Sequence, residues 1–205
     1  TRVVDFGEID GKTDLMATVL YEGSKGTKIS SITFNHLLTQ FSIKVYAPDA
    51  AAQGLWGTVS SIKIAEKKQT CTITLPAATE AANTAAAPTF TGNSDLDLVN
   101  TDLTTSPAAT INYPLTLGVG TAANAAQAGY AMFAPQTTGN VVLKIELSSG
   151  VTQTVNVPVP TTPAPAGFLH GHAYEITLKF SSSAITPTVA VADWVPVTNT
   201  PEVEI

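Results

Sequence analysis

The sequence predicts an all-β protein built from two β-sandwich domains, and three observations support this class. Apolar and polar residues alternate over several short runs, most clearly from His172 to Phe180, as they do in strands with one buried face. Clusters of Gly, Pro, Asn, Asp and Ser separate these runs and are typical of turns. No long window shows the apolar spacing of an amphipathic helix.

Composition agrees with this class and excludes several functions. A chain of 205 residues can form two sandwiches of about 100 residues each. It is 44% hydrophobic and only 13% charged, so it has ample material for a core. The net charge of −6 argues against nucleic-acid binding, which usually needs a basic surface, and against docking on anionic lipid. No apolar run is long enough for a membrane-spanning helix.

The single cysteine, Cys71, excludes an internal disulfide and a four-cysteine zinc site. Cys71 shares one strand face with Ile73 and Leu75, and no basic residue adjoins it, so we expect a core residue and not a nucleophile. Low charge and abundant Thr and Ala favour an exported protein. The residues from Thr1 to Asp5 do not resemble a secretory signal, so we expect any such signal to lie outside this chain.

The first part of the chain predicts two strand-forming segments after a loop at residues 1–14. Leu15 to Tyr21 is the first strand, and residues 29–46 form a longer apolar segment. In this segment the apolar positions change from one parity to the other. Because a one-residue slip turns every side chain to the opposite face, we expect a β-bulge or a short helical turn around Leu37 to Gln40.

A hairpin is predicted next, followed by a long loop region. Residues 59–66 and 70–75 alternate as strands, with a turn at residues 67–69 between them. The Ala- and Thr-rich residues 76–88 are predicted as a surface loop, and residues 89–110 as loop-like. Asp95, Asp97 and Asp102 lie in this region without the glycine and distant glutamate of a calcium loop, so we expect a solvated acidic face.

The second half of the chain contains the best-patterned strands. They are predicted at residues 113–119, 129–134, 140–147, 151–159, 172–180 and 188–193. The sequence from Thr104 to Thr110 is the predicted seam between an N-terminal sandwich (residues 1–107) and a C-terminal sandwich (residues 108–205).

The candidate ligand-binding residues favour structural roles. His170 and His172 have the spacing of two metal ligands on one strand face, but no third ligand is nearby, and Gly171 indicates a turn. His36 lies on the apolar parity of its strand, as a histidine at the edge of a core does. Trp56 and Trp194 would form a carbohydrate platform if exposed, although Trp194 is better placed to plug the core.

No catalytic motif is present. The chain lacks the G-x-S-x-G nucleophile elbow, the G-x-x-x-x-G-K-[ST] loop and the G-x-G-x-x-G loop. Its carboxylates have no helices or barrel strands to set the separation that glycoside hydrolysis requires. We therefore expect a protein that is not an enzyme and needs no cofactor.

Three passages together resemble the FimA/Mfa-type fimbrillins of Bacteroidales. Residues 34–45 begin with FNHLLT, which is similar to the F-x-H-x-L-T strand near the start of these proteins. Residues 171–174 (GHAY) and 191–194 (VADW) resemble their G-x-x-Y … D-W ending. Residues 132–136 (MFAPQ) are similar to the strand ending in Pro-Gln between these two passages.

This resemblance implies a structural subunit or tip component of cell-surface fimbriae. Such proteins have two β-sandwich domains of transthyretin-like, Greek-key topology, are exported as outer-membrane lipoproteins and join to other fimbrial subunits by β-strand exchange. An N-terminal segment is removed after an arginine, which makes Arg2 a candidate cleavage site. Adhesion to host or bacterial surface ligands is also implied.

The residues after Trp194 are the candidate donor strand. Val195, Val197, Val203 and Ile205 alternate with polar residues, as a strand that fills pockets in a neighbour does. The same residues also suit an edge strand of their own domain, with Pro196 and Pro201 preventing further pairing. An alternative function is that of a monomeric, carbohydrate-binding surface lipoprotein.

Overall fold

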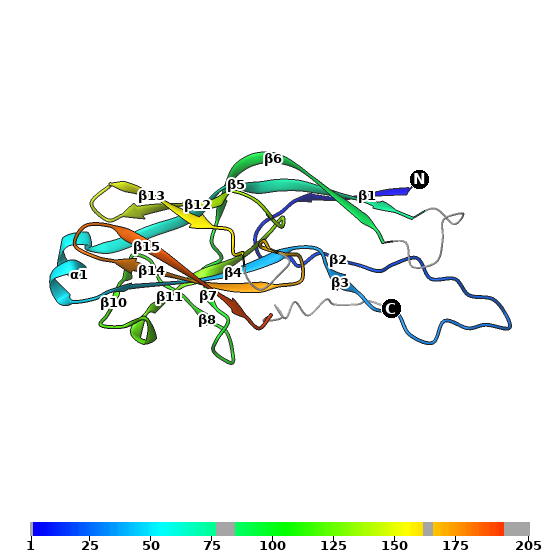
Figure 1. The fold of residues 1–205 in the computed structure, drawn as a ribbon, viewed down its shortest axis with the longest axis horizontal. Coiled ribbons are helices and arrows are strands. Elements are labelled where there is room, and N and C mark those ends of the chain that lie inside the picture. Colours follow the sequence, from blue (N-terminus) through cyan, green and yellow to red (C-terminus); the bar gives the residue numbers. More distant parts are fainter. Residues whose placement is uncertain (1, 77–84, 162–165, 195–205) are drawn as a thin grey trace.

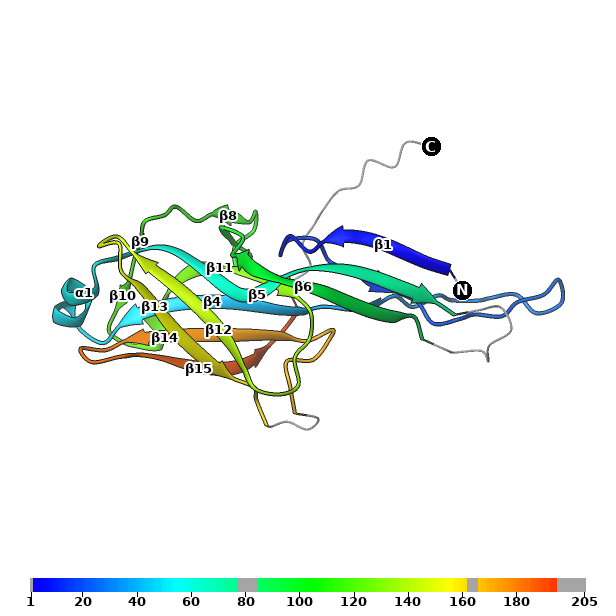
Figure 2. The same cartoon turned by 90° about the horizontal axis from the view of Figure 1, so that it is seen from above.

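The computed structural model describes residues 2–76, 85–161 and 166–194. Two β-sheets face each other across one core, and the strands of the first sheet continue beyond the second (Figure 1). In the perpendicular view, β1, β5 and β6 reach away from the sandwich toward one end of an elongated molecule (Figure 2). The all-β class is confirmed.

The first sheet is organised around one long strand, β5. It contains β1 (Arg2–Glu8), β5 (Thr58–Leu75), β6 (Ala87–Asp97), β9 (Leu115–Thr116), β12 (Asn140–Leu147) and β13 (Thr152–Pro158). Ile64 pairs with both β12 and β6, and Ile73 pairs with both β1 and β6. Because a strand has two edges, β12 and β1 therefore share one edge of β5, and β6 occupies the other.

The second sheet is organised around β4. It contains β4 (Thr39–Ala47), β10 (Gly118–Val119), β11 (Ala126–Phe133), β14 (Ala173–Phe180) and β15 (Ile185–Ala192). β4 runs parallel to β14 and antiparallel to β11. Two short pairs stand apart from both sheets: β2 (Met16–Ala17) with β3 (Asn35–His36), and β7 (Thr101–Asp102) with β8 (Ala109–Thr110).

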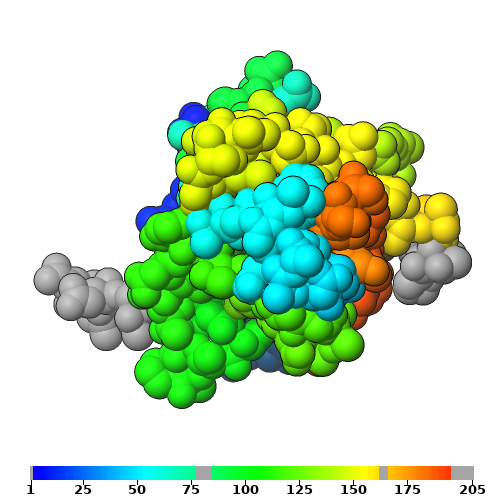
Figure 3. Space-filling view, turned by 90° about the vertical axis from the view of Figure 1, so that its left-hand side faces the viewer, coloured from blue at the N-terminus to red at the C-terminus, as the bar shows by residue number. Residues whose placement is uncertain are grey.

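A short helix closes one end of the sandwich. The side chain of Asp49 accepts a hydrogen bond from the N–H of Ala52 at 2.8 Å and starts α1 (Ala50–Trp56), which Gly57 ends at a φ of 71°. Figure 3 looks onto this end, where α1 (cyan) lies below the hairpin of β12 and β13 (yellow) and beside the end of the β14–β15 hairpin (orange). A single 3₁₀ turn, η1 (Ala122–Asn124), follows β10.

The main core contains buried residues from Phe41 to Phe180. Phe41 on β4 makes edge-to-face contacts with Phe133 on β11 and with Phe168, at centroid distances of 4.7 and 4.6 Å. Phe168 in turn packs edge to face on Tyr174 of β14 at 4.9 Å. These rings are almost completely buried, so residues far apart in the sequence form one apolar cluster between the sheets.

The pairing crosses the predicted division at residue 107. β4 and β5 precede this residue, yet they pair with β11, β12 and β14, which follow it. The segments 1–107 and 108–205 therefore do not form separate sandwiches in the described residues. The physical reason is that each half supplies strands to both sheets, so neither half can bury its apolar faces without the other.

Most of the strands of the second half were predicted correctly. β11, β12, β13, β14 and β15 lie where alternation places them, within a few residues. The interruption predicted near residues 37–40 is also present. β3 ends at His36 and β4 starts at Thr39, with Leu37 and Leu38 between them outside any strand. Both leucines are buried, which is why the apolar parity changes there.

Four predictions in the first half were wrong. The loop predicted at residues 1–14 contains the strand β1, which pairs with β5. The hairpin turn at residues 67–69 does not exist, because β5 continues through them with a bulge at Glu66, whose φ is 59°. The predicted loop at residues 89–97 belongs to β6, which β5 holds by pairing despite its polar sequence. From Leu15 to Tyr21 only Met16 and Ala17 form a strand, because the rest of this segment has almost no pairing partner.

Candidate functional site

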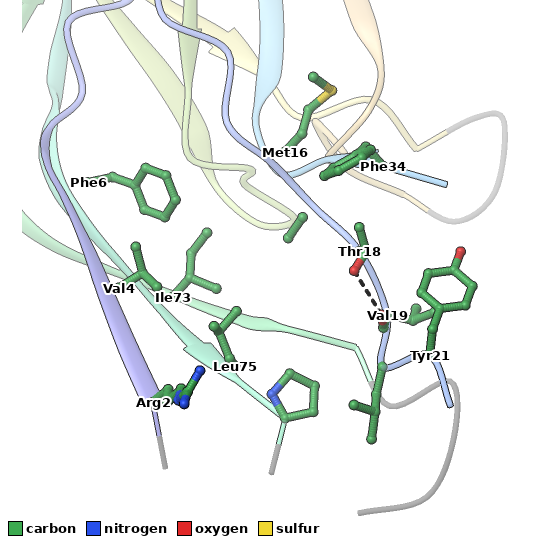
Figure 4. A pocket seen from close by; sticks show the side chains of 13 residues that line it. Arg2, Val4, Phe6, Met16, Thr18, Val19, Tyr21, Phe34, Ile73 and Leu75 are labelled. Carbon is green, nitrogen blue, oxygen red and sulfur yellow. Dashed lines mark hydrogen bonds between the residues drawn. The ribbon is translucent and has the colours of Figure 1, made fainter. Parts of the chain in front are cut away.

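An open apolar groove lies at the end of the molecule where β1 and β5 extend beyond the second sheet. It has a volume of about 480 Å³ (Figure 4). The lining residues come from β1, the end of β5 and the segment around β2: Arg2, Val4, Phe6, Met16, Ala17, Thr18, Val19, Leu20, Tyr21, Phe34, Ile73, Leu75 and Pro76.

One wall of the groove is formed by β1 and β5. Val4 pairs with Ile73 across the ladder, and both side chains point into the groove (Figure 4). The alternation of β1 places Phe6 on the same face. Val4 and Phe6 are 37% and 44% exposed, so this wall presents apolar surface to solvent.

The opposite wall is an extended segment with little main-chain pairing. Met16 and Ala17 pair with β3, and Val19 forms a single bridge to Ala85. Within the described residues, the backbone of Thr18 and Leu20 belongs to no strand. This wall therefore lacks the ladder that normally completes a sheet.

The same segment separates the groove from a second apolar hollow. Ala17, Thr18 and Val19 line both spaces, and the second has a volume of about 210 Å³. Met16 and Phe34 line the groove on this side, and their side chains are 45% and 59% exposed. The site is thus a long apolar surface that the described part of the chain leaves uncovered.

A small cluster of three side chains lies beside the base of the groove. Nδ1 of His36 lies 2.6 Å from Oδ2 of Asp14, within hydrogen-bond distance. The imidazole also stacks at 4.3 Å on the indole of Trp194, which packs on the second, smaller apolar core. His36 therefore connects the segment between β1 and β2 to Trp194, the last described residue.

Burial dominates the electrostatics of this cluster. It raises the pKa of the Asp14 carboxyl above its ordinary value of 3.8, although the neighbouring His36 acts in the opposite direction. Oδ1 of Asp14 is buried and has no hydrogen-bond partner among the described residues. Ionising Asp14 in the folded protein therefore costs more than ionising it in the unfolded chain.

We expect an Asp14→Asn variant to change the pH dependence of stability. Between pH 3.8 and the raised pKa, the folded state holds more protons than the unfolded state, so the free energy of unfolding of the native sequence falls as pH rises. Asparagine removes this loss and keeps an acceptor for His36. Urea unfolding at about pH 4 and about pH 7 measures it: the variant should gain stability relative to the native sequence at the higher pH. Parallel pH profiles of the two proteins would contradict the assignment.

The other candidate residues have structural roles. Cys71 is fully buried in the second core, as predicted, and burial raises the pKa of its thiol. Nδ1 of His172 lies 3.0 Å from the carbonyl oxygen of His170 across a turn in which Gly171 has a φ of 70°. Among the described residues no three His, Cys, Asp or Glu side chains form a metal site.

Two aspartates of the predicted acidic face form ion pairs, and Trp56 is held by a hydrogen bond. Asp95 and Asp97 pair with Lys144 and Lys63, at 2.7 and 3.1 Å. The indole N–H of Trp56 donates to the carbonyl of Ser181 at 2.6 Å, and this half-buried ring makes no open platform.

Of the residues predicted for processing and strand donation, only Arg2 lies within the described part of the chain. Arg2 is exposed on β1 at the rim of the groove. Val195, Val197, Val203 and Ile205 lie outside the described residues. Within the described residues, no helix is long and apolar enough to cross a membrane.

Comparison with known sequences shows the family of this chain. The sequence profile of the fimbrillin-like family matches residues 9–194, so the chain belongs to the fimbrillin-like family. No curated protein sequence matches it.

Three of the solved structures that are similar to this chain are as follows. The first, described as a "putative cell adhesion protein" from Bacteroides uniformis, has a TM-score of 0.54 and 18% identity, with 94% of this chain and 66% of that chain covered. Another so described, from Bacteroides ovatus, has a TM-score of 0.44 and 19% identity, with 80% and 48% covered. The tip fimbrial protein Mfa3 of Porphyromonas gingivalis has a TM-score of 0.40 and 9% identity, with 87% and 61% covered. This chain thus spans about half to two thirds of these relatives, and the first of them supports the fold.

Proposed function

We propose that this protein is a structural subunit of a cell-surface fimbrium, not an enzyme, and that its apolar groove accepts a β-strand from a neighbouring subunit. The observation that carries the proposal is the open groove. Its walls bring four exposed large apolar side chains, Val4, Phe6, Met16 and Phe34, together on one continuous surface. Membership of the fimbrillin-like family supports the fimbrial role.

The groove suits a strand better than a compact ligand. β1 pairs with β5 along one edge, and its other edge has no partner strand among the described residues. The backbone of Thr18 and Leu20 on the facing wall is likewise outside any strand. An inserted strand would satisfy main-chain groups on either wall, and its alternate apolar side chains would fill the groove between them.

The donor in this proposal is the segment with Val195, Val197, Val203 and Ile205 of an adjacent subunit. Its alternation presents apolar side chains on one face, which matches the apolar lining of the groove. Processing after Arg2 is part of the same proposal, since this arginine is exposed at the rim of the groove. We place the assembled protein at the bacterial surface, where attachment to the outer membrane through a lipid stays a prediction.

Two variants that each remove one partner test this assembly. A chain ending at Trp194 lacks the donor and keeps the groove. A Phe6→Glu/Phe34→Glu variant keeps the donor, and its two charges oppose burial of an apolar strand in the groove. Because both phenylalanines are exposed, at 44% and 59%, we expect little loss of folding.

On electrophoresis of unheated samples, the unchanged chain should form a ladder and each variant alone should remain monomeric. A mixture of the two variants should form a dimer and nothing larger, because only one donor and one groove are intact. Leu55→Glu is the matched control, since Leu55 is 64% exposed on α1, far from the groove. Ladders from the shortened chain would show that the tail is not the donor.

The alternative of a carbohydrate-binding protein that uses Trp56 gains no support from its geometry. The ring packs edge to face on Phe180 at 5.8 Å and its N–H is already bonded to the main chain. A sugar stacking on Trp56 would have to displace these contacts.

A further inference from the structure

A second cleft, polar in character, opens where the first sheet splits. β12 pairs with β5 as far as Ile64, and β1 pairs with it from Thr70. Between these points, on the edge of β5 that β1 and β12 share, residues 65–68 face no described strand. The cleft at this gap has a volume of about 480 Å³ and lies apart from the apolar groove.

An irregularity in the backbone of β5 accompanies the cleft. The register of β5 with β6 shifts between Ile64 and Lys68, and Glu66 within this shift has a φ of 59°. A residue other than glycine in this conformation is strained, and such strain often accompanies binding sites. The bulge directs Lys67 toward the gap, where its ammonium lies 5.7 Å from the centroid of the buried Phe133 ring.

Lys67 is a half-buried cation that no carboxylate of the described residues approaches within salt-bridge distance. Its neighbours Lys63, Lys68 and Lys144 each form an ion pair, at 3.1, 3.1 and 2.7 Å, whereas Lys67 forms no salt bridge among the described residues. Burial lowers the pKa of the Lys67 ammonium, with Glu66 acting in the opposite direction. A carboxylate from a ligand would compensate this buried charge.

The other lining groups are suited to hydroxyls. Nε2 of Gln69 donates to the carbonyl of Gly92 at 3.0 Å, but its Oε1 is buried without a partner among the described residues. The side-chain amides of Asn93 and Asn140 line the cleft and make no hydrogen bond to the rest of the described chain. An orphaned acceptor and two free amides can bind several hydroxyl groups at once.

We infer that this cleft binds an acidic sugar, with the sugar carboxylate on Lys67 and the ring hydroxyls on Gln69, Asn93 and Asn140. The volume of the cleft lies within the range of small-ligand sites. Val142, which is only partly buried, supplies an apolar side chain against which a sugar ring can pack. This inference goes beyond the proposed assembly and does not depend on it.

Titration of the full chain with glucuronate, glucose and acetate tests this inference, with binding followed by NMR chemical shifts. Glucuronate should bind at least about tenfold more tightly than glucose or acetate, because only it meets the cation and the amides together. The resonances that shift should include the Asn93 and Asn140 side-chain amides. Equal binding of acetate would assign the cleft to carboxylates of any source, and equal binding of glucose would exclude a role for Lys67; either result overturns the proposal.

Lys67→Met removes the charge and keeps an apolar chain over Phe133. It should weaken glucuronate binding by about tenfold or more, the loss expected for one bond to a charged group, and leave the weak affinity for glucose unchanged. Lys179→Met on β14 is the matched control, a lysine without an ion pair among the described residues in the other sheet. Lys67→Arg, which keeps the charge, should restore binding in part. Unchanged glucuronate affinity in a folded Lys67→Met protein would refute the assignment.

Discussion

Replacing Phe41 by alanine should destabilise the protein by about 3–5 kcal/mol, the usual cost of a buried phenylalanine-to-alanine change. Phe41 is fully buried on β4 and touches the rings of Phe133, Phe168 and Tyr174. The smaller side chain leaves a cavity at the point where β11, β14 and the loop before β14 meet. A loss of this size is a large share of the total stability of an ordinary domain.

Chemical denaturation of the native sequence and the variant measures this loss. Phe34→Ala is the matched control, since Phe34 is 59% exposed beside the groove and its removal should change the free energy of unfolding by less than about 1 kcal/mol. Because Phe34 lines the proposed acceptor site, the same control should instead weaken assembly. Similar losses of stability from both changes would mean that the four-ring cluster is not the centre of the core.

Replacing Gly129 by alanine should cost about 2–5 kcal/mol, because two effects add. The φ of Gly129 is 134°, a conformation that side chains rarely allow. A Cβ there would also lie 2.6 Å from the carbonyl oxygen of Val99. The adjacent Tyr130 exchanges two main-chain hydrogen bonds with Val99, at 2.8 and 3.2 Å, so relief of the clash would break this bridge.

Replacing Gly54 by alanine should instead stabilise the protein. Gly54 lies within α1, and a Cβ added there meets nothing within 4 Å. Because alanine favours a helix more than glycine does, this variant should be more stable by up to about 1 kcal/mol. Thermal unfolding of both variants tests the pair. A stable Gly129→Ala protein would show that the bridge between Val99 and Tyr130 is dispensable.

The residues of the fimbrillin-like motifs have the structural roles that the sequence predicted for His36 and Trp194. His36 was predicted as a core-edge histidine, and it lies between Asp14 and the tryptophan of the D-W passage. Tyr174, in the GHAY part of the same G-x-x-Y … D-W ending, donates its hydroxyl proton to the carbonyl of Gly167. It accepts a hydrogen bond from the N–H of Leu169. The first and last of the passages that resemble fimbrillins therefore have structural contacts: they link Asp14 to Trp194 and brace the loop before β14.

The sequence analysis predicted neither the apolar groove nor the polar cleft, for different reasons. The apolar groove depends on Met16 to Tyr21, which read as a strand but finds almost no partner. The polar cleft depends on Lys67, which was predicted in a turn between two strands. The only signal in its favour was the run of five polar residues from Glu66 to Thr70, and a turn explains such a run equally well.

The sequence alone determined the all-β class, the positions of β11 to β15, and the absence of a recognisable catalytic motif. These properties are local, because alternation with a period of two and the spacing of motif residues can be read within a few neighbours. The tertiary structure alone decided which strands share a sheet, that one core crosses residue 107, and where the two clefts open. Pairing such as that of β4 with β14 depends on contacts between distant residues, and no local pattern specifies a strand's partner.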